Sequence, residues 1–488
     1  MSKNSVITTL FALVALMGWA QSTNTATITG YSPALKDSTI AMLGIDNEFV
    51  ATDTVIGGRF TLTVPLGELT LSHLFLHGEN CPNYLMRIYL TPGQTISLSG
   101  TDCLYPLWRV DSPVAEQQTI NRIMEYNRET LKEYFQLQLA HASWEEAGPV
   151  HWKCYKQEMD YLLSLPVDAV VISELEVIAQ MARYNEDFPY IQQLKELETS
   201  IAARAPKGFE QELAQIHSYV YPSHILQAGE EAADAELFDM QGNSHRLFDA
   251  FADGRYVLLD FWQISCGPCI MSEPEMREVY ERMKGKLEIV GINMDKPDQW
   301  KKSDFSKKIT WKNWNNGNMG RGGFVTNYLD EGFIPYYVLI SPDRHIFWKT
   351  KSYNVGYFMG LAEALNGPKQ DNSSNLSLAV RHTSVNANGT KVCFRKYGKK
   401  EHKFSIAKDS YLTANGKKYK LTSVDGIILD ADNYPEVNAF TAKEDYIGDI
   451  NYTDFTLTFE PFETIPETFD FKAGDVEGAF VIRNISLK

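Results

Sequence analysis

The 488-residue sequence lacks an excess of basic charge: 46 lysines and arginines stand against 62 aspartates and glutamates, and the formal net charge at pH 7 is −16. A nucleic-acid footprint needs a basic face, so this balance argues against nucleic acid as a partner. The sequence also lacks a repeat of 20–50 residues, which argues against a solenoid. Its composition, 44% hydrophobic and 22% charged, argues against a disordered or collagen-like chain. At this length one core is too few, and we expect about three or four domains.

Long apolar runs are missing beyond the N-terminus. The first residues combine one early cation, Lys3, with an apolar run over residues 6–19 and small residues before a cleavage point after Ala20. This pattern is typical of a secretory signal peptide over residues 1–20. The run is short for a membrane span, and no basic stop-transfer flank follows it. We therefore expect a mature chain without a membrane span, exported to the periplasm or cell envelope.

Cysteine is scarce, with six residues in the chain. In an exported protein, disulfide chemistry is the first interpretation of a cysteine, ahead of zinc binding. Cys81 and Cys103 are a candidate structural disulfide, because closing a loop of that size contributes about 3 kcal/mol. Two buried free thiols are the alternative. Cys154 and Cys393 have no partner near in the sequence, and we expect them to be buried and unpaired.

The spacing of apolar residues predicts a multidomain chain. Alternation in segments such as "RFTLTV" favours an N-terminal antiparallel β domain over residues 25–111. Apolar residues at helical spacing indicate a helical domain over residues 112–223. Strands and helices then alternate over residues 232–367, which is the pattern of an α/β fold. After a polar linker, strand patterns with "NG" and "DG" turns predict a C-terminal β-sandwich over residues 378–488.

Two cysteines in "LLDFWQISCGPCIMSEPEM" stand where a predicted strand ends and a predicted helix begins. The first N–H groups of a helix and its positive dipole end favour a thiolate at Cys266. Cys269 lies one turn further into the helix, so it is placed to attack a mixed disulfide formed on Cys266. The spacing therefore predicts a redox-active disulfide, with Cys266 as the attacking thiolate and Cys269 as the resolving thiol.

This stretch resembles the active site of the thioredoxin superfamily. Asp260 stands six residues before Cys266, where the family has a buried carboxylate that manages the proton of the second cysteine. Pro274 matches the proline that kinks the active-site helix. Ile334-Pro335 in "GFIPYYVLI" matches the family's cis-proline, which faces the dithiol and holds the main chain of the substrate. The segments "FDMQGNSHRLFDAF" and "NMDKPDQW" resemble the exported TlpA/ResA-like branch, and the other domains resemble multidomain envelope proteins of Bacteroidetes.

One departure from the family lies beside the first cysteine. The family usually has an aromatic residue there, most often Trp, and this sequence has Ser265, which removes an apolar shield and part of a client-contact surface. The resemblance implies that Ser265, Gly267, Pro268 and Ile334 contact the substrate. The Gly- and Asn-rich stretch 313–324 is predicted to be a mobile loop that the substrate passes.

Other interpretations of these residues stay open. The C-x-x-C pair could be a structural crosslink, and zinc would need two more ligands, for which His151 and Cys154 form an H-x-x-C pair in another domain. Peroxiredoxin chemistry requires a Pro and a Thr ahead of the reactive cysteine, which "FWQISC" lacks. Asp260 has the alternative of a solvent-exposed carboxylate at a strand end, and Pro335 that of a trans proline on an edge strand. We expect no metal site.

The resemblance implies an exported thiol–disulfide oxidoreductase with no cofactor other than its Cys266–Cys269 disulfide. Gly-Pro between the cysteines is typical of reducing members of the family, whose reduction potential is about −270 mV, rather than of oxidising members, whose reduction potential is about −120 mV. The expected partners are disulfide-containing envelope proteins and a membrane thiol donor similar to DsbD. The alternative function is a non-catalytic binding or scaffold protein of the envelope, since a fold does not by itself imply an activity.

Overall fold

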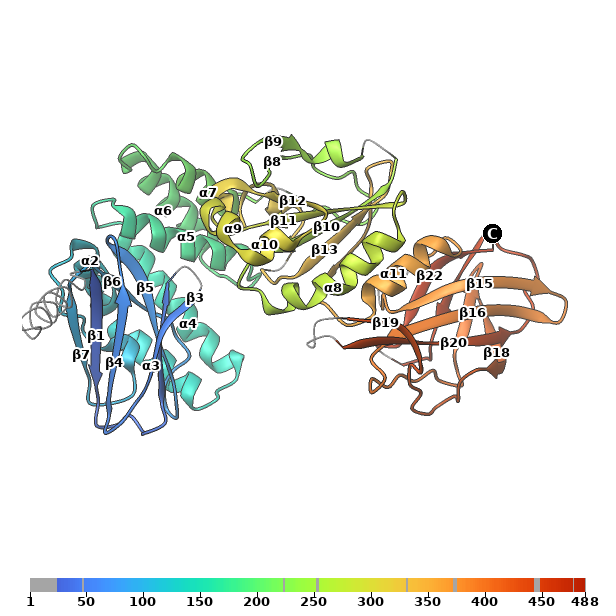
Figure 1. Ribbon diagram of the computed structural model, residues 1–488, viewed down its shortest axis with the longest axis horizontal. Coiled ribbons are helices and arrows are strands. Elements are labelled where there is room, and N and C mark those ends of the chain that lie inside the picture. The colour runs from blue at the N-terminus through green and yellow to red at the C-terminus, as the bar shows by residue number, and fades with distance from the viewer. Residues whose placement is uncertain are drawn as a thin grey trace, which may run out of the picture. The chain divides into compact units, whose positions relative to one another are not determined.

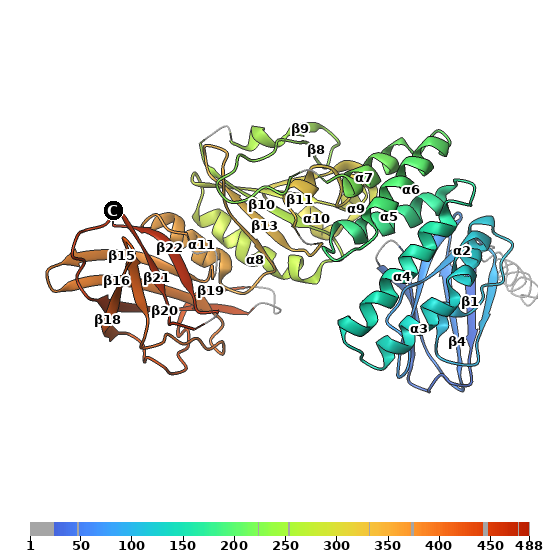
Figure 2. The same ribbon diagram turned by 180° about the vertical axis from the view of Figure 1, so that it is seen from behind.

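The computed structural model describes residues 24–45, 48–222, 224–251, 254–330, 332–371, 375–442, 448–476 and 478–487. The predicted signal peptide at residues 1–20 lies outside these ranges. Contacts divide the chain after Val220 into two compact units (Figures 1 and 2). The predicted fold class is confirmed: the first unit holds β sheets and a helical segment, and the second holds an α/β part and a C-terminal β part. The domain boundaries within each unit stay predictions.

Two small sheets form the β part of the first unit. Their strands alternate buried and exposed side chains, as in β4, where every second residue is buried, so each sheet turns one apolar face to a shared core. All pairs are antiparallel except β1 with β7, which is parallel. The first sheet has the order β4 (Arg59–Pro65), β1 (Thr25–Tyr31), β7 (Thr95–Ser99), and the second has the order β3 (Glu48–Thr54), β2 (Ile40–Ile45), β5 (Thr70–His77), β6 (Met86–Leu90).

Helices complete the first unit after the short 3-10 helix η1 (Tyr105–Leu107). Their apolar faces pack into one cluster, and the Asp168 side chain caps the start of α5 by accepting a hydrogen bond from the Val171 N–H at 2.9 Å. The helices are α2 (Ala115–Tyr126), α3 (Arg128–Leu139), α4 (Trp144–Leu162), α5 (Ala169–Arg183), α6 (Ile191–Arg204) and α7 (Glu210–Val220). No helix in the described ranges is long and apolar enough to cross a membrane.

The α/β part of the second unit is built on a seven-stranded mixed sheet. Its central strands are buried on both faces, which explains their nearly continuous apolar sequence. The strands, in sheet order, are β14 (Ile346–Lys351), β13 (Tyr336–Ile340), β10 (Tyr256–Trp262), β11 (Leu287–Asn293), β12 (Lys312–Asn315), β8 (Glu236–Phe238) and β9 (Ser244–Arg246). The helices are η2 (Leu247–Phe251), α8 (Gly267–Arg282), α9 (Pro297–Lys302), α10 (Asp304–Lys308) and α11 (Tyr357–Asn366).

The stretch 313–324 corrects a prediction. Its first residues are not loop: Asn313, Trp314 and Asn315 belong to β12, are buried, and pair in parallel with β11. Asparagine is disfavoured in strands, but these side chains find polar partners inside, as Asn315 does when it donates to the Asn293 Oδ1 at 2.8 Å. The following residues form two 3-10 turns, η3 (Gly317–Met319) and η4 (Gly323–Asn327).

The C-terminal part is one antiparallel sheet of eight strands that closes around a single aromatic core. Phe394 on β16 contacts both Phe455 on β20 and Phe471 on β21, at ring distances of 5.2 and 4.6 Å, although β16 and β21 are far apart in the sheet. The sheet therefore curls into a sandwich-like shape. Its strands are β15 (Leu378–Asn386), β16 (Gly389–Gly398), β17 (Tyr411–Ala414), β18 (Lys417–Asp425), β19 (Val437–Thr441), β20 (Asp449–Phe459), β21 (Thr468–Lys472) and β22 (Val481–Ser486).

Candidate active site

The two cysteines lie where β10 passes into α8. Cys266 is the N-cap of α8, and its Sγ accepts a hydrogen bond from the Cys269 N–H at 3.2 Å. A disulfide joins the two residues, whose Cα atoms are 5.3 Å apart. Both cysteines are buried, with 8% of Cys266 and 5% of Cys269 exposed, while Gly267 and Pro268 between them are exposed. A partner would therefore approach the sulfur atoms across this exposed dipeptide.

Apolar side chains surround the disulfide. Trp262 at the end of β10 and Trp300 on α9 form one buried cluster with the two cysteines. The partly buried Ile334 packs against the same cluster, while Ser265 is exposed. Burial by itself disfavours a thiolate, but with little water to screen it, the positive end of the α8 dipole acts more strongly on a negative charge at the Cys266 sulfur.

The Ile334–Pro335 peptide bond is cis, and Pro335 is buried at the start of β13. The structure thus brings the predicted Ile334 to the disulfide from a part of the chain almost seventy residues away. The residue before it, Phe333, is 69% exposed. Sequence reasoning did not single out Phe333; its signal is a large aromatic residue directly ahead of an Ile-Pro pair.

Asp260 lies inside the sheet, on the face that α8 covers. Side chains alternate along β10, so Asp260 shares its face with Leu258, which packs against α8, and with Trp262, which packs against the cysteines. Only 5% of Asp260 is exposed, which rules out the alternative of a solvent-exposed carboxylate. Burial, and second the charge of Glu273, raise the pKa of Asp260 to about 8. At neutral pH the Asp260 carboxyl is therefore mostly protonated.

Glu273, on the buried face of α8, is a second acidic side chain that sequence reasoning missed. It is 3% exposed, and the Arg277 guanidinium one turn further on donates to both of its oxygens, at 2.8 and 2.5 Å. This pairing holds the Glu273 side chain in the interior, and the charge of Glu273 opposes ionisation of Asp260. The only sequence signal was the run "SEPE" after the second cysteine, which reads as an ordinary first turn of a helix.

A buried polar network holds the loop ahead of the cysteines. The Asp295 carboxylate accepts hydrogen bonds from the Ile264 N–H at 2.8 Å and from the Asn293 amide at 2.7 Å. Arg321, from the Gly-rich stretch, donates to the Gln263 side chain at 2.8 Å. Two separate segments, residues 293–295 and the stretch that holds Arg321, therefore position the loop that carries Ser265.

The remaining cysteines lie elsewhere. Cys81 and Cys103 are free thiols in the structure, where a disulfide was predicted, and their side chains are hydrogen-bonded to each other. Burial raises the pKa of Cys81 to about 12, so it is protonated at neutral pH. Cys154 is a buried free thiol as predicted, whereas Cys393 is only half-buried. 

His151, the partner of Cys154 in the alternative zinc pair, packs among aromatic rings, including Tyr134 at a ring distance of 4.7 Å. Burial lowers its pKa to about 4. Within the described ranges, no group of three or more His, Cys, Asp or Glu side chains is arranged to hold a metal ion.

A known protein family matches the α/β part, and curated relatives and solved structures match part of the chain. Residues 228–350 match the AhpC/TSA family. Thiol-disulfide oxidoreductase ResA of Halalkalibacterium halodurans is 33% identical over 75 residues, which are 15% of this chain and 42% of that protein. Thioredoxin-like protein YneN of Bacillus subtilis is 32% identical over 77 residues, which are 16% of this chain and 44% of that protein. The chain thus spans less than half the length of these curated relatives.

Solved structures with similar regions include two from Bacteroides. A thiol:disulfide interchange protein from Bacteroides sp. is 29% identical, with a TM-score of 0.23 over 25% of this chain and 81% of that one. A thioredoxin domain of a thiol-disulfide oxidoreductase from Bacteroides vulgatus is 28% identical, with a TM-score of 0.23 over 26% of this chain and 91% of that one. The family match and the curated relatives confirm the predicted resemblance to thioredoxin-like proteins of the ResA kind.

Proposed function

We propose that this chain, whose residues 228–350 are thioredoxin-like, is an exported thiol–disulfide oxidoreductase that reduces disulfides of envelope proteins through Cys266 and Cys269. The observation that carries the proposal is the position of the Cys266–Cys269 disulfide at the N-terminus of α8, packed against Ile334 of the cis Ile334–Pro335 pair. A helix N-terminus stabilises a thiolate there. The resemblance to the thioredoxin superfamily implies that Pro335 faces the dithiol and holds the main chain of the substrate. The signal-peptide pattern supports export.

The reaction is an exchange of thiols and disulfides. In the reduced protein, the Cys266 thiolate attacks one sulfur of the client disulfide, which forms a mixed disulfide and releases one client thiolate. The Cys269 thiolate then attacks the Cys266 sulfur, which releases the second client thiolate and forms the Cys266–Cys269 disulfide. Two electrons pass to the client, whose thiolates take up two protons, and a thiol donor must then reduce the new disulfide.

Asp260 is suited to manage the proton of Cys269. Cys269 must lose its proton before it can attack, and the buried Asp260 has a pKa of about 8, close to the ordinary pKa of a thiol. A group with a matched pKa can accept and return a proton at low cost. The ionised fraction of Asp260, about a tenth of the molecules at pH 7 for a pKa of about 8, is therefore the proton acceptor for the resolving step.

The proposed direction is reduction. Gly267 and Pro268 form the dipeptide of reducing members, so we expect a potential near about −270 mV, with recharging by a membrane thiol donor similar to DsbD. Ser265 in place of an aromatic residue makes the surface beside Cys266 less apolar, and we expect this to change which client proteins bind there.

Insulin reduction by the full chain tests the proposal. We expect the chain to accelerate reduction of the insulin disulfides by dithiothreitol, and to equilibrate with a reducing thiol buffer near the potential given above. An inert Cys266–Cys269 pair would favour the scaffold function instead. Consumption of hydrogen peroxide without insulin reduction would favour the peroxiredoxin alternative, and a potential near about −120 mV would contradict the reducing direction.

Replacing Phe333 by alanine is expected to weaken reduction of a protein substrate. Phe333 is exposed directly before Ile334, so it offers the apolar surface that Ser265 does not. We expect kcat/KM for insulin to fall about five-fold, since an exposed aromatic contact is worth on the order of 1 kcal/mol. Kinetics with insulin and with a small aromatic disulfide measure the effect.

The matched control is Ile428→Ala, which removes an apolar side chain that is equally exposed, at 69%, from the C-terminal β part. It is expected to leave both rates unchanged. Equal losses on the small and the protein substrate for Phe333→Ala would show that this residue supports the site rather than contacts clients.

A further inference from the structure

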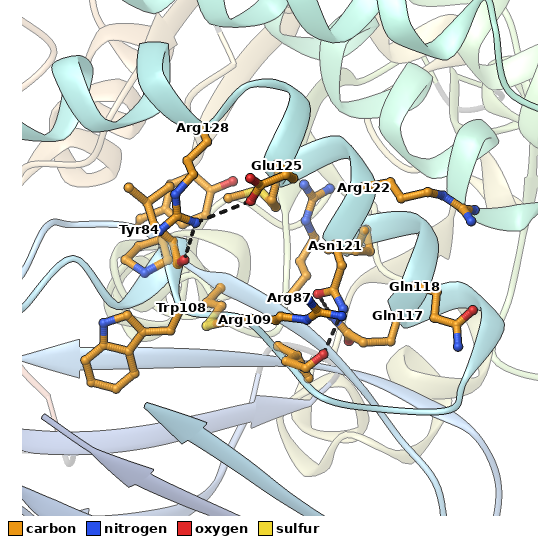
Figure 3. A pocket seen from close by; sticks show the side chains of 16 residues that line it. Tyr84, Arg87, Trp108, Arg109, Gln117, Gln118, Asn121, Arg122, Glu125 and Arg128 are labelled. Carbon is orange, nitrogen blue, oxygen red and sulfur yellow. Dashed lines mark hydrogen bonds and ion pairs between the residues drawn. The ribbon is translucent and has the colours of Figure 1, made fainter. Parts of the chain in front are cut away.

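A pocket with a volume of about 530 Å³ lies in the first unit, apart from the disulfide chemistry (Figure 3). Its walls are the strand β6, the helix α2, the 3-10 helix η1 and the chain over residues 108–110 that follows η1. The volume falls within the range of about 300–1,000 Å³ that is usual for small-molecule sites. No residue of the proposed redox site lines it.

The inner surface of the pocket is apolar. Met86 from β6 and Ile120 from α2 are each 5% exposed, and Leu107 of η1 is 6% exposed. The half-buried Met124, one turn along α2, extends this surface. These side chains are apolar and either flexible, as in methionine, or branched, as in leucine and isoleucine, and they pack well against the apolar part of a ligand.

The charge of the pocket is opposite to that of the chain. Among the sixteen side chains that line it there are four arginines and one acidic residue, Glu125, although the protein carries a net charge of −16. Arg87 is neutralised inside by an ion pair with the buried Glu174. Arg109 and Arg122 are exposed and Arg128 is half-buried, so these three present positive charge to solvent at the pocket.

Most donors of these three arginines are not used by the protein. Arg109 makes no hydrogen bond or ion pair with any residue in the described ranges. Arg122 donates to the Thr119 hydroxyl at 3.0 Å, and Arg128 donates to the Leu107 carbonyl at 2.9 Å. Glu125 is 3.6 Å from Arg128 and its side chain is 74% exposed, so it neutralises little. A guanidinium has five N–H donors, which leaves several at each residue for a ligand.

We propose that this pocket binds a small organic oxyanion, a carboxylate or a phosphate carried on an apolar body. Guanidinium groups bind both kinds of oxyanion with paired hydrogen bonds, and the apolar inner surface takes the rest of the molecule. The site does not depend on the proposed redox activity, and its failure or success leaves that activity untouched.

Ligand-detected NMR with the full chain tests the proposal. The probes are 4-phenylbutyrate, phenyl phosphate and the neutral 4-phenylbutyramide. We expect saturation transfer to one or both anions, weakened by added salt, and little transfer to the amide. The relative affinity of the two anions tells which oxyanion the site prefers.

Arg109→Gln is the variant of choice because Arg109 has no structural contact to lose. Its affinity for the preferred anion is expected to fall about ten-fold, the loss that corresponds to one charge-assisted hydrogen-bonded contact. The control Arg59→Gln removes an exposed arginine of β4 outside the pocket and is expected to bind like the wild type. Equal binding of the amide and the anions, or an unchanged affinity in Arg109→Gln, would overturn the proposal.

Discussion

Cys266→Ser is expected to abolish disulfide reduction, with a loss of at least about a thousand-fold in insulin turnover. Serine cannot form a disulfide, and the Cys266 sulfur at the N-terminus of α8 is the only one of the pair that the helix dipole stabilises as a thiolate. The Cys269 sulfur is more buried, at 5% exposed, and lies one residue inside the exposed Pro268. It cannot take over the attack on a bulky client.

Cys269→Ser is expected to behave differently, because the first attack is intact and the resolving step is missing. Mixed disulfides between Cys266 and clients should therefore accumulate, and they can be isolated from envelope extracts and identified by mass spectrometry after reduction. This experiment also names the clients. 

The control Cys393→Ser removes a half-buried thiol of the C-terminal β part and is expected to keep full turnover. Wild-type activity in both Cys266→Ser and Cys269→Ser would sink the assignment of this pair.

Asp260→Asn is expected to stabilise the protein by an amount that grows as pH rises from about 4 to about 8, and to slow its catalysis. The folded-state pKa of Asp260 is raised from 3.8 to about 8, so the folded chain keeps a proton that the unfolded chain releases. The free energy of unfolding therefore falls as pH rises through this window, from about pH 4 to about pH 8, by about 1.4 kcal/mol per pH unit. The loss in the free energy of unfolding that Asp260 causes is absent below about pH 4 and complete above about pH 8, where it is on the order of 5 kcal/mol.

Asparagine cannot ionise, so Asp260→Asn does not carry this cost. Calorimetry of the oxidised protein at pH 4, 6 and 8 should show that the melting temperature of the variant exceeds that of the wild type by an amount that grows with pH. The comparison with the wild type cancels other titrating groups. The control Asp304→Asn changes a carboxylate whose side chain is 92% exposed, and is expected to shift the melting temperature little at any pH.

The catalytic half of this prediction concerns the resolving step. Without a proton acceptor near Cys269, insulin turnover is expected to fall by about 10²-fold, with accumulation of the mixed disulfide. Glu273→Gln provides a second variant: removing the charge of Glu273 lowers the folded-state pKa of Asp260, so the upper end of the pH window moves down while the lower end stays near pH 4. If the difference in melting temperature between Asp260→Asn and the wild type is the same at all three pH values, the buried, protonated carboxyl is contradicted.

Much of the site was visible in the sequence because its signals are local. An apolar strand that holds Asp260 six residues before Cys266, a C-x-x-C pair and a helix start need only nearby residues to be recognised. The same holds for the alternation that predicted β4 and for the apolar run of β10. Local propensity failed where tertiary contacts overrode it, as in β12, where Asn315 donates to the buried Asn293 of β11 and Asn313 donates to the Ser306 carbonyl of α10.

The sequence by itself determined the order of the helices and strands, the position of the cysteine pair and the position of Pro335. Each of these has a turn, periodicity or motif signal that lies within a few residues. Only the tertiary structure decided which side chains meet. The charge of Glu273 on α8 raises the pKa of Asp260 on β10. Asp295, just after β11, accepts a hydrogen bond from the loop that carries Ser265, and the pocket of the first unit is lined by residues of both β6 and α2. Such contacts depend on how strands and helices pack, and packing brings together residues whose separation in the chain carries no signal.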